Sequence, residues 1–448
     1  MDMINLVYIH THDTGRYIEP YGYAVHTPHL QSLASQSTVF RNAHSTSPTC
    51  SPSRAGLLTG TYPHESGMLG LAHRGFRLNK YQQHIVSHLK NVGYTTALSG
   101  VQHVAPRKEL IGYDYVLDAS QEYFDRGIQD STAYDMENSE LAAEFIESVD
   151  TAGGVPFFLS FGMLNTHRPF PKPESRAADF IRPPCSLPDT AAVREDAAGF
   201  YTALETVDRC VGRVLAALER SGHDKDTLVL FTTDHGPAFP GMKATLHDSG
   251  TGVALMMRLP SARGTAAAGP KICDALVSQL DIFPTICELT GTPHPHQMRG
   301  LSLLPLLYGK HGELHSHLYT ETTFHAACEP ARAVRTLRYK LVRHYSADEC
   351  RLPANVDDSV VKDLFHKSGY FSEKVSRAEL FDLVLDPLER CNRLNDPRYR
   401  SVYRELELAL DEWMKTTGDP LLAGAVDAPI GALLNSASSY SPDSGEFV

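Results

Sequence analysis

Short apolar runs that stop abruptly at polar residues recur along the first two thirds of the chain. The clearest are Ile4–Ile9, Pro156–Phe161 and Thr227–Thr232, and weaker ones lie at Thr95–Ser99 and Val253–Met257. Runs of this length, bounded in this way, are typical of strands that are buried on both faces of a parallel sheet. We therefore expect these segments to be strands of one sheet.

Helical patterns lie between these runs, at Thr27–Ser35, Lys80–Asn91, Arg194–Ser221 and Asp274–Leu289. Pro28 suits the first position of the first helix, and a Ser-Gly or Thr-Gly step ends each of the last two. Strands that alternate with helices predict an α/β fold, in which helices cover both faces of a doubly wound sheet.

This alternation ends near residue 310. Beyond it, Leu318–Glu321 and Arg338–Tyr345 have the pattern of antiparallel strands, and Pro397–Thr417 that of an amphipathic helix. The sequence thus predicts three parts: a large domain over residues 1–310, a smaller α+β subdomain over 311–417, and an extended tail over 418–448. The apolar residues of the tail lead us to expect that it packs along its own subunit or a neighbour.

Composition excludes several classes of protein. The chain has 448 residues, of which 42% are hydrophobic and 21% charged, which excludes a disordered or fibrous protein. A net charge of −12 argues against nucleic acid or an anionic membrane as a partner. No apolar run is long enough to span a membrane, and no signal peptide is visible, so the cytoplasm is the expected compartment. Cysteines are too sparse for a disulfide scaffold and form no Cys-x-x-Cys pair. The sequence leaves a homo-oligomer open.

Polar side chains follow three of the predicted strands. His12 and Asp13 follow the first, His167 follows the second, and Asp234 and His235 follow the third. One Asp-His-Gly sequence alone most often marks a turn. Ligands of open α/β sheets, however, bind beyond the carboxyl ends of the strands, and three such ends in one chain favour a site. Asp13, Asp234 and His235, with His12, offer nitrogen and oxygen donors for a divalent cation.

A second candidate feature is the segment Ser45–Gly60, STSPTCSPSRAGLLTG. Pro52 suits the first turn of a helix, which places Cys50 at a helix N-terminus, where an anion is favoured. Arg54 adds a bidentate donor for a tetrahedral oxyanion. Two other interpretations of Cys50 stay open on this evidence, a buried apolar thiol and an ordinary thiolate nucleophile.

The sequence CSPSRAGLLTG resembles the signature of type I, formylglycine-dependent sulfatases of the alkaline-phosphatase-like superfamily. Further matches occur along the chain in the family order. One lies before this segment, at Thr27–Leu30, and three lie after it, at Thr233–Gly236, Lys243–Leu246 and Glu379–Leu383. Within this family, Pro63–Met68 and Gln102–Pro106 are similar to the heparan N-sulfatase (sulfamidase) group. The resemblance implies an alkaline-phosphatase-like fold, with a large, mixed, mostly parallel sheet between helices and a smaller C-terminal subdomain that carries a short antiparallel sheet.

The resemblance also implies a cofactor and a modification. Cys50 would be oxidised to formylglycine by a formylglycine-generating or other sulfatase-maturing enzyme. The modified residue would attack sulfur and would share one divalent metal ion with His12, Asp13, Asp234 and His235. The family favours Ca²⁺; the imidazoles of His12 and His235, where the family usually has Asp and often Asn, make Mn²⁺ an alternative.

The remaining roles follow from the same matches. Arg54 would hold and polarise residue 50, and His103 would be the base of the second step. His167 and Lys243 would contact the sulfate, and one of them would protonate the leaving group. The family lysine two residues before His103 is Val101 here.

The expected activity is that of a sulfuric ester hydrolase acting on sulfate esters or sulfamates, with a sulfated small molecule or saccharide as substrate. Two alternatives stay open. One is a phosphonate monoester or phosphodiester hydrolase of the same superfamily, and the other is a non-catalytic protein that binds sulfated glycans.

Overall fold

The computed structural model describes residues 4–117, 130–149, 154–173, 177–261, 271–310, 312–346, 348–444 and 447. Parts of the predicted domains and tail, including residues 1–3, 311, 445, 446 and 448, lie outside these ranges.

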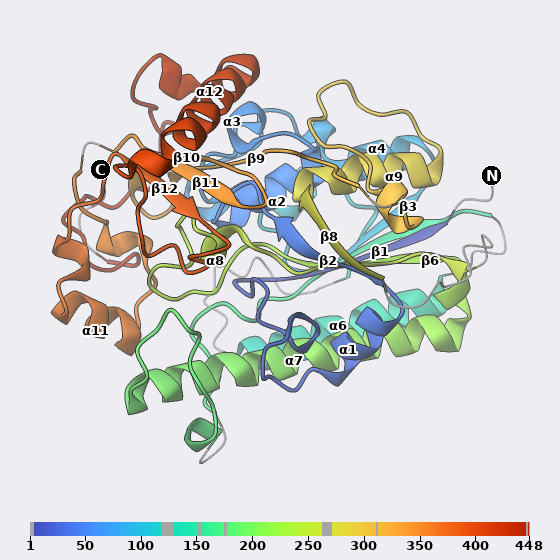
Figure 1. Ribbon diagram of the computed structural model, residues 1–448. Coiled ribbons are helices and arrows are strands. Elements are labelled where there is room, and N and C mark those ends of the chain that lie inside the picture. Colours follow the sequence, from blue (N-terminus) through green and yellow to red (C-terminus); the bar gives the residue numbers. More distant parts are fainter. Residues whose placement is uncertain are drawn as a thin grey trace.

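An eight-stranded sheet crosses the larger part of the molecule (Figure 1), in the strand order β4-β3-β5-β1-β6-β7-β2-β8. Its strands are β1 (Asn5–Thr11), β2 (Thr38–His44), β3 (Thr95–Gly100), β4 (Tyr115–Val116), β5 (Phe157–Gly162), β6 (Thr227–Thr233), β7 (Leu255–Arg258) and β8 (Lys271–Ser278). β7 is antiparallel to both of its neighbours, and the other pairs are parallel. The predicted mixed, mostly parallel sheet is confirmed.

Helices cover both faces of this sheet (Figure 1), with α1, α6 and α7 on one face and α2, α4 and α9 on the other. Among the described residues up to 310, the α-helices are α1 (Pro28–Ser35), α2 (Cys50–Thr59), α3 (Pro63–Ser66), α4 (Ile85–Asn91), α6 (Ser131–Ser148), α7 (Ala191–Ser221), α8 (Asp248–Thr251), α9 (Ile282–Thr290) and α10 (Leu304–Leu307). None of the described helices is both long and apolar enough to cross a membrane.

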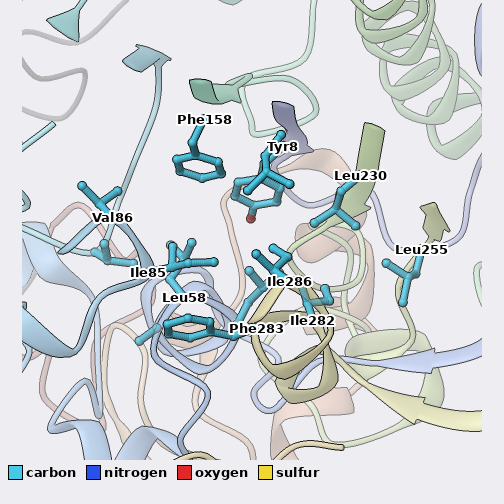
Figure 2. Close-up of a cluster of buried hydrophobic side chains, with 14 of the residues drawn as sticks. Tyr8, Leu58, Ile85, Val86, Phe158, Leu230, Leu255, Ile282, Phe283 and Ile286 are labelled. Carbon is cyan, nitrogen blue, oxygen red and sulfur yellow. The ribbon is translucent and has the colours of Figure 1, made fainter. Parts of the chain in front are cut away.

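The central strand β1 is apolar without interruption from Leu6 to Ile9, because both of its faces pack against other parts of the core. Leu6 and Tyr8 belong to the core cluster on one face of the sheet, and Val7 and Ile9 belong to the cluster on the other. Figure 2 shows the first cluster, where Tyr8 and its neighbours from the strands face Phe283 of α9. Because both faces are covered, the middle of the strand has no polar side, and its polar residues Asn5, His10 and Thr11 stand at its two ends.

The C-terminal part holds a separate four-stranded antiparallel sheet, in the order β12-β11-β10-β9. Its strands are β9 (Leu318–Phe324), β10 (Cys328–Arg335), β11 (Tyr339–His344) and β12 (Ala378–Asp382), and two helices accompany them, α11 (Val360–Lys367) and α12 (Arg400–Thr417). Trp413 of α12 packs in one cluster with Val334, Leu341 and Leu380 of this sheet. The short antiparallel sheet expected here is confirmed.

The predicted helix Asp274–Leu289 is wrong over its first part. The chain continues as strand β8 to Ser278 and becomes the helix α9 only at Ile282. Side chains of β8 alternate between half-buried and exposed from Lys271 to Ala275, as expected of an edge strand. This alternation is short and leads directly into the helical pattern of α9, so the sequence does not separate the two elements. Sequence reasoning also missed the strand β2 and the helix α6.

Candidate active site

The carboxyl ends of β1 and β6 bring the first group of site residues together. The two strands are paired in parallel with Thr11 opposite Thr233, so the residues that follow them lie side by side. The backbone N–H of Asp13 donates to Asp234 Oδ1 across a distance of 2.8 Å. His12, Asp13, Asp234 and His235 are all buried. The expected convergence of these strand ends is therefore present.

Four donor atoms at this edge could hold one metal ion. One ligand atom each of His12, Asp13, Cys50 and Asp234 lies within 4.8 Å of all the others. Both ring nitrogens of His12 are buried without a hydrogen-bond partner among the described residues. Burial, with the nearby Arg54, lowers the pKa of His12 well below its usual value, so the imidazole is neutral, as a metal ligand must be. The donor set fits a single divalent cation.

His235 lies beside this group rather than within it. Its Nε2 atom is 3.2 Å from Cys50 Sγ and 3.2 Å from Asp13 Oδ1. Its Nδ1 atom lies 2.9 Å from the carbonyl oxygen of Gly236, to which a proton on Nδ1 is donated, and its Nε2 atom faces the centre. Its role as a metal ligand stays a prediction.

Cys50 is the first residue of α2, as predicted from Pro52, and all ten residues of this helix are buried. Burial raises the pKa of the Cys50 thiol well above its usual value, against the pull of Lys243. A neutral, buried thiol is a poor nucleophile, which argues against the thiolate interpretation. The Sγ atom marks the place where the oxygen atoms of a formylglycine side chain would lie.

Arg54, one turn further along α2, connects the helix to the strand ends. Its Nη2 atom donates to Asp234 Oδ2 at 3.0 Å and to the carbonyl oxygen of Thr11 at 2.9 Å, and Nη1 contacts His10 Nδ1. Burial acts to raise the pKa of Asp234, but His235 and Arg54 outweigh it and hold this pKa below its usual value. Arg54 thus keeps Asp234 ionised.

Lys243 lies opposite Cys50, where three polar side chains meet it. Its Nζ atom is 2.8 Å from Asp13 Oδ2, 3.1 Å from Asp357 Oδ2 and 3.4 Å from His167 Nε2. Burial acts to lower the pKa of Lys243, but the two carboxylates outweigh it and raise it well above its usual value. Lys243 therefore carries a positive charge at neutral pH. Asp357 was not identified from the sequence, because it lies in a loop that no motif or strand end marks.

His103 belongs to a pair of imidazoles. Its Nε2 atom lies 3.0 Å from Nδ1 of His73, and the two rings are stacked. Burial lowers the pKa of both, to about 3 for His73, so both rings are neutral at pH 7. A neutral His103 is suited to accept a proton. His73 was also missed. Val101, in place of the family lysine, packs with Tyr134 and Leu164.

A buried carboxyl group on α6 fixes the loop that presents His167. Asp135 accepts hydrogen bonds from the backbone N–H groups of Leu164 and Asn165 and from the Asn165 side chain, at 2.7 to 2.8 Å. Burial raises the pKa of Asp135 to about 7, although these hydrogen bonds act to lower it. The loop before His167 thus rests on one titratable side chain.

Asp135 makes the stability of the protein depend on pH. Its pKa is higher in the folded chain than in the unfolded chain, so its contribution is fully present below about pH 4 and is lost as the pH rises to about 7. Asp135→Asn removes this dependence. Relative to the parent, the variant should gain about 1–3 kcal/mol in unfolding free energy between pH 5 and pH 8. Urea unfolding at both pH values measures it, with the exposed Glu137→Gln on the same helix as control. An equal pH dependence in parent and Asp135→Asn would contradict this assignment.

Comparisons with known proteins agree with the motifs. The family model described as "Sulfatase" matches residues 4–292. The model described as "N-sulphoglucosamine sulphohydrolase, C-terminal" matches residues 242–370.

Similar individual proteins cover nearly the whole chain. N-sulphoglucosamine sulphohydrolase from Homo sapiens is 28% identical over 92% of this chain and 88% of its own length. An ulvan-active sulfatase from Formosa agariphila is 27% identical over 91% of this chain and 78% of its own length. A solved structure of a protein in complex with its substrate, D-glucosamine-2-N,6-O-disulfate, superposes with a TM-score of 0.73 at 18% identity, covering 93% of this chain and 98% of the other.

Together the two family models extend over residues 4–370, which include the large sheet, three of the four strands of the smaller sheet and every motif that carried the resemblance except Glu379–Leu383. The fold, the order of the motifs and the sequence similarity agree. The chain belongs to the sulfatase family and is an enzyme of the sulfuric ester hydrolase class.

Proposed function

We propose that this enzyme removes sulfate from sulfated saccharides, as esters or sulfamates, with a formylglycine made from Cys50 and one divalent metal ion. The observation that carries this proposal is the position of Cys50. Its Sγ atom lies in a four-donor group with His12, Asp13 and Asp234, at the N-terminus of a helix and beside a positively charged Lys243. A sulfate group is a tetrahedral anion, and the helix N-terminus, Lys243 and a divalent ion held by these donors would place positive charge around it.

The nucleophile side of the site consists of residue 50, Arg54 and His103. Formylglycine at position 50 would supply a hydroxyl nucleophile, and a divalent ion held by His12, Asp13 and Asp234 would supply positive charge at the sulfate oxygens. Arg54 fixes Asp234 and the end of β1. His103 is neutral and buried, so it can take a proton from residue 50 in the second step.

The leaving-group side consists of Lys243 and His167. Lys243 is held charged by Asp13 and Asp357, so it serves as a fixed positive charge for sulfate. His167 Nδ1 lies 2.6 Å from the carbonyl oxygen of Arg168, and Nε2 faces Lys243. The His167 side chain is 19% exposed, whereas Lys243 is 2% exposed and Asp13 is fully buried, so His167 stands on the side where a leaving group would reach solvent. We assign the proton of the leaving group to this pair.

The relatives bear on the choice of substrate. One is named for N-sulphoglucosamine and another for ulvan, and both are similar to this chain over about nine tenths of its length. Their names support a sulfated saccharide for this chain as well. The match of the C-terminal N-sulphoglucosamine sulphohydrolase model supports testing a sulfamate first.

The test uses protein produced together with a sulfatase-maturing enzyme. We expect mass spectrometry of the peptide that contains Cys50 to show an aldehyde or its hydrate in place of the thiol. A panel of N-sulfated glucosamine, O-sulfated sugars, an aryl sulfate and a phosphonate monoester is then compared by kcat/KM. The proposal predicts the highest value for a sulfated saccharide.

Three results would overturn this proposal. Full activity from protein that carries only unmodified Cys50 would exclude formylglycine. A kcat/KM for the phosphonate ester above that of every sulfated substrate would favour the phosphonate or phosphodiester hydrolase. Binding of sulfated saccharides without turnover, by fully modified protein, would favour the non-catalytic alternative.

A further inference from the structure

The last residues of the chain run back across three loops that carry side chains of the active site. We call residues 431–442 the strap. The loop 72–75 carries His73, which contacts His103. The loop 324–327 carries His325, whose pKa is held well below its usual value by burial and by the nearby Lys243. The loop 355–358 carries Asp357, which pairs with Lys243. The strap makes hydrogen bonds to all three loops.

The first loop is held through Arg74, the neighbour of His73. The Arg74 guanidinium donates to Asn435 Oδ1 at 2.9 Å and to the carbonyl oxygen of Pro442 at 2.5 Å, and its own carbonyl oxygen accepts from Leu433 N–H at 2.9 Å. Gly75 has a φ of +96°, and a Cβ atom there would come within 3.0 Å of Ala432 Cα. Glycine at position 75 thus lets the strap lie directly on the backbone of this loop.

The other two loops are held by the same short segment. The backbone N–H of Asn435 donates to the carbonyl oxygen of Ala326, next to His325, at 2.9 Å. Ser441 Oγ donates to Asp358 Oδ2, next to Asp357, at 2.5 Å. Lys362 joins the strap to this third loop, because its Nζ atom donates to Tyr440 O at 2.6 Å, Asp358 Oδ1 at 2.7 Å and Val356 O at 2.8 Å.

Asn435 is the centre of the strap. It is 3% exposed, and its side-chain N–H groups donate to the carbonyl oxygens of Ser441 and Ser444, at 3.2 and 3.3 Å. Its Oδ1, Nδ2 and backbone N–H groups therefore bind Arg74, the end of the strap itself and Ala326. One side chain thus connects elements that are more than 350 residues apart in the sequence.

We propose that the strap is a positioning element of the active site, which holds the pairs His73–His103 and Asp357–Lys243 at a fixed separation on either side of the substrate. This inference rests on the proposed function, because it assigns the two pairs to the two steps of one reaction. The three loops lie outside the central sheet and its helices. Other hydrogen bonds also hold them, from Ala72 N–H to Ser51 Oγ of α2 at 3.0 Å and from Ala327 N–H to Asn355 Oδ1 at 2.8 Å. The strap adds one segment that binds all three loops. A displacement of a reacting group by about 1 Å can cost about 100-fold in rate.

The experiment compares a chain that ends after Gly431 with the single variants Asn435→Ala and Ile430→Ala. Ile430 is fully exposed and serves as the matched control within the tail. We expect Asn435→Ala to lower kcat about 10-fold with little change in KM, truncation to lower kcat about 100-fold, and Ile430→Ala to leave both unchanged. Addition of a synthetic peptide of residues 430–448 to the truncated chain should restore part of the lost kcat.

Hydrogen exchange gives a readout that does not depend on activity. Loops 72–75, 324–327 and 355–358 should exchange faster in the truncated chain and in Asn435→Ala, while the strands β1 and β6 keep the exchange rates of the parent. If the truncated chain does not fold, the exchange rates and kcat of Asn435→Ala alone test the proposal. If the parent lacks sulfatase activity, the proposed function fails and the exchange rates alone judge the strap.

Two outcomes would contradict the proposal that the strap positions the active site. One is unchanged exchange in all three loops after truncation. The other is a loss of kcat that follows global unfolding, with β1 and β6 exchanging as fast as the loops.

Discussion

Replacement of Cys50 by alanine lowers kcat on the order of 10³-fold or more, because it removes the atom from which the proposed nucleophile is made. The neighbouring Arg54 and Lys243, which pair with Asp234 and Asp13, cannot compensate, because a cation stabilises charge on the sulfate but does not attack sulfur. Sulfate release, measured by ion chromatography with the best substrate of the panel, gives kcat. The side chain of Cys50 is small and buried, so the variant should fold.

Cys210 provides the matched control for this experiment. It is also fully buried, but it lies on α7, where its sulfur contacts Met136 rather than the site. Cys210→Ala should keep kcat within about twofold of the parent while losing a similar number of buried atoms. A Cys50→Ala variant that kept more than a tenth of the parent activity would place the nucleophile elsewhere.

Removal of the Asp234 carboxylate should release the metal ion and lower kcat by at least about 100-fold. Asp234→Ala removes one donor of the four-donor group and also leaves Arg54 without its buried partner. Breaking a buried ion pair costs about 3–5 kcal/mol, so a loss of stability alone does not identify a metal ligand. The decisive measurement is the metal content after loading with Ca²⁺ or Mn²⁺ and gel filtration, which also tells which ion is retained.

The variant Asp248→Ala is the control that separates loss of the metal ion from loss of stability. It is a carboxylate that pairs with Lys340 at 2.6 Å and Arg335 at 3.2 Å, away from Cys50. Asp248→Ala should lose stability to a similar extent while keeping one metal ion per chain. Equal metal content in Asp234→Ala and the parent would contradict the proposed donor set.

The parts of the site at strand ends could be predicted from the sequence, and the parts in loops could not. A buried parallel strand leaves a clear pattern, and ligands bind beyond its carboxyl end, so His12, Asp13 and Asp234 could be placed from the pattern of residues alone. His73 and Asp357 lie in irregular segments, where no periodicity relates sequence position to direction in space. They reach the site only because the smaller sheet and the loop after α3 fold over the edge of the large one.

The same physical reason explains the errors in the fold. β8 is an edge strand with a half-exposed face, and its apolar residues lead directly into those of α9, so the sequence does not mark where the strand ends and the helix begins. The helix α6 has only a weak apolar stripe, because Ser, Glu and Asn occupy many of its positions, and Asp135 and Asn138 are among its buried residues. Asp135 of this helix accepts hydrogen bonds from the loop that presents His167. A pattern of hydrophobic residues does not predict a polar contact of this kind.

The burial of α2 sets an order of events in the biosynthesis of the enzyme. Cys50 is 1% exposed and every residue of its helix is buried, so a second protein cannot reach this thiol once the fold is complete. The chain that closes over it includes β6 and the residues around Lys243, which leave the ribosome almost two hundred residues later. Any enzyme that converts Cys50 must therefore act while the chain is still being made or is still unfolded. Under the proposed function, a folded molecule that missed this interval would stay unconverted for its lifetime, and the active fraction of a preparation would be fixed by the speed of folding relative to that of conversion.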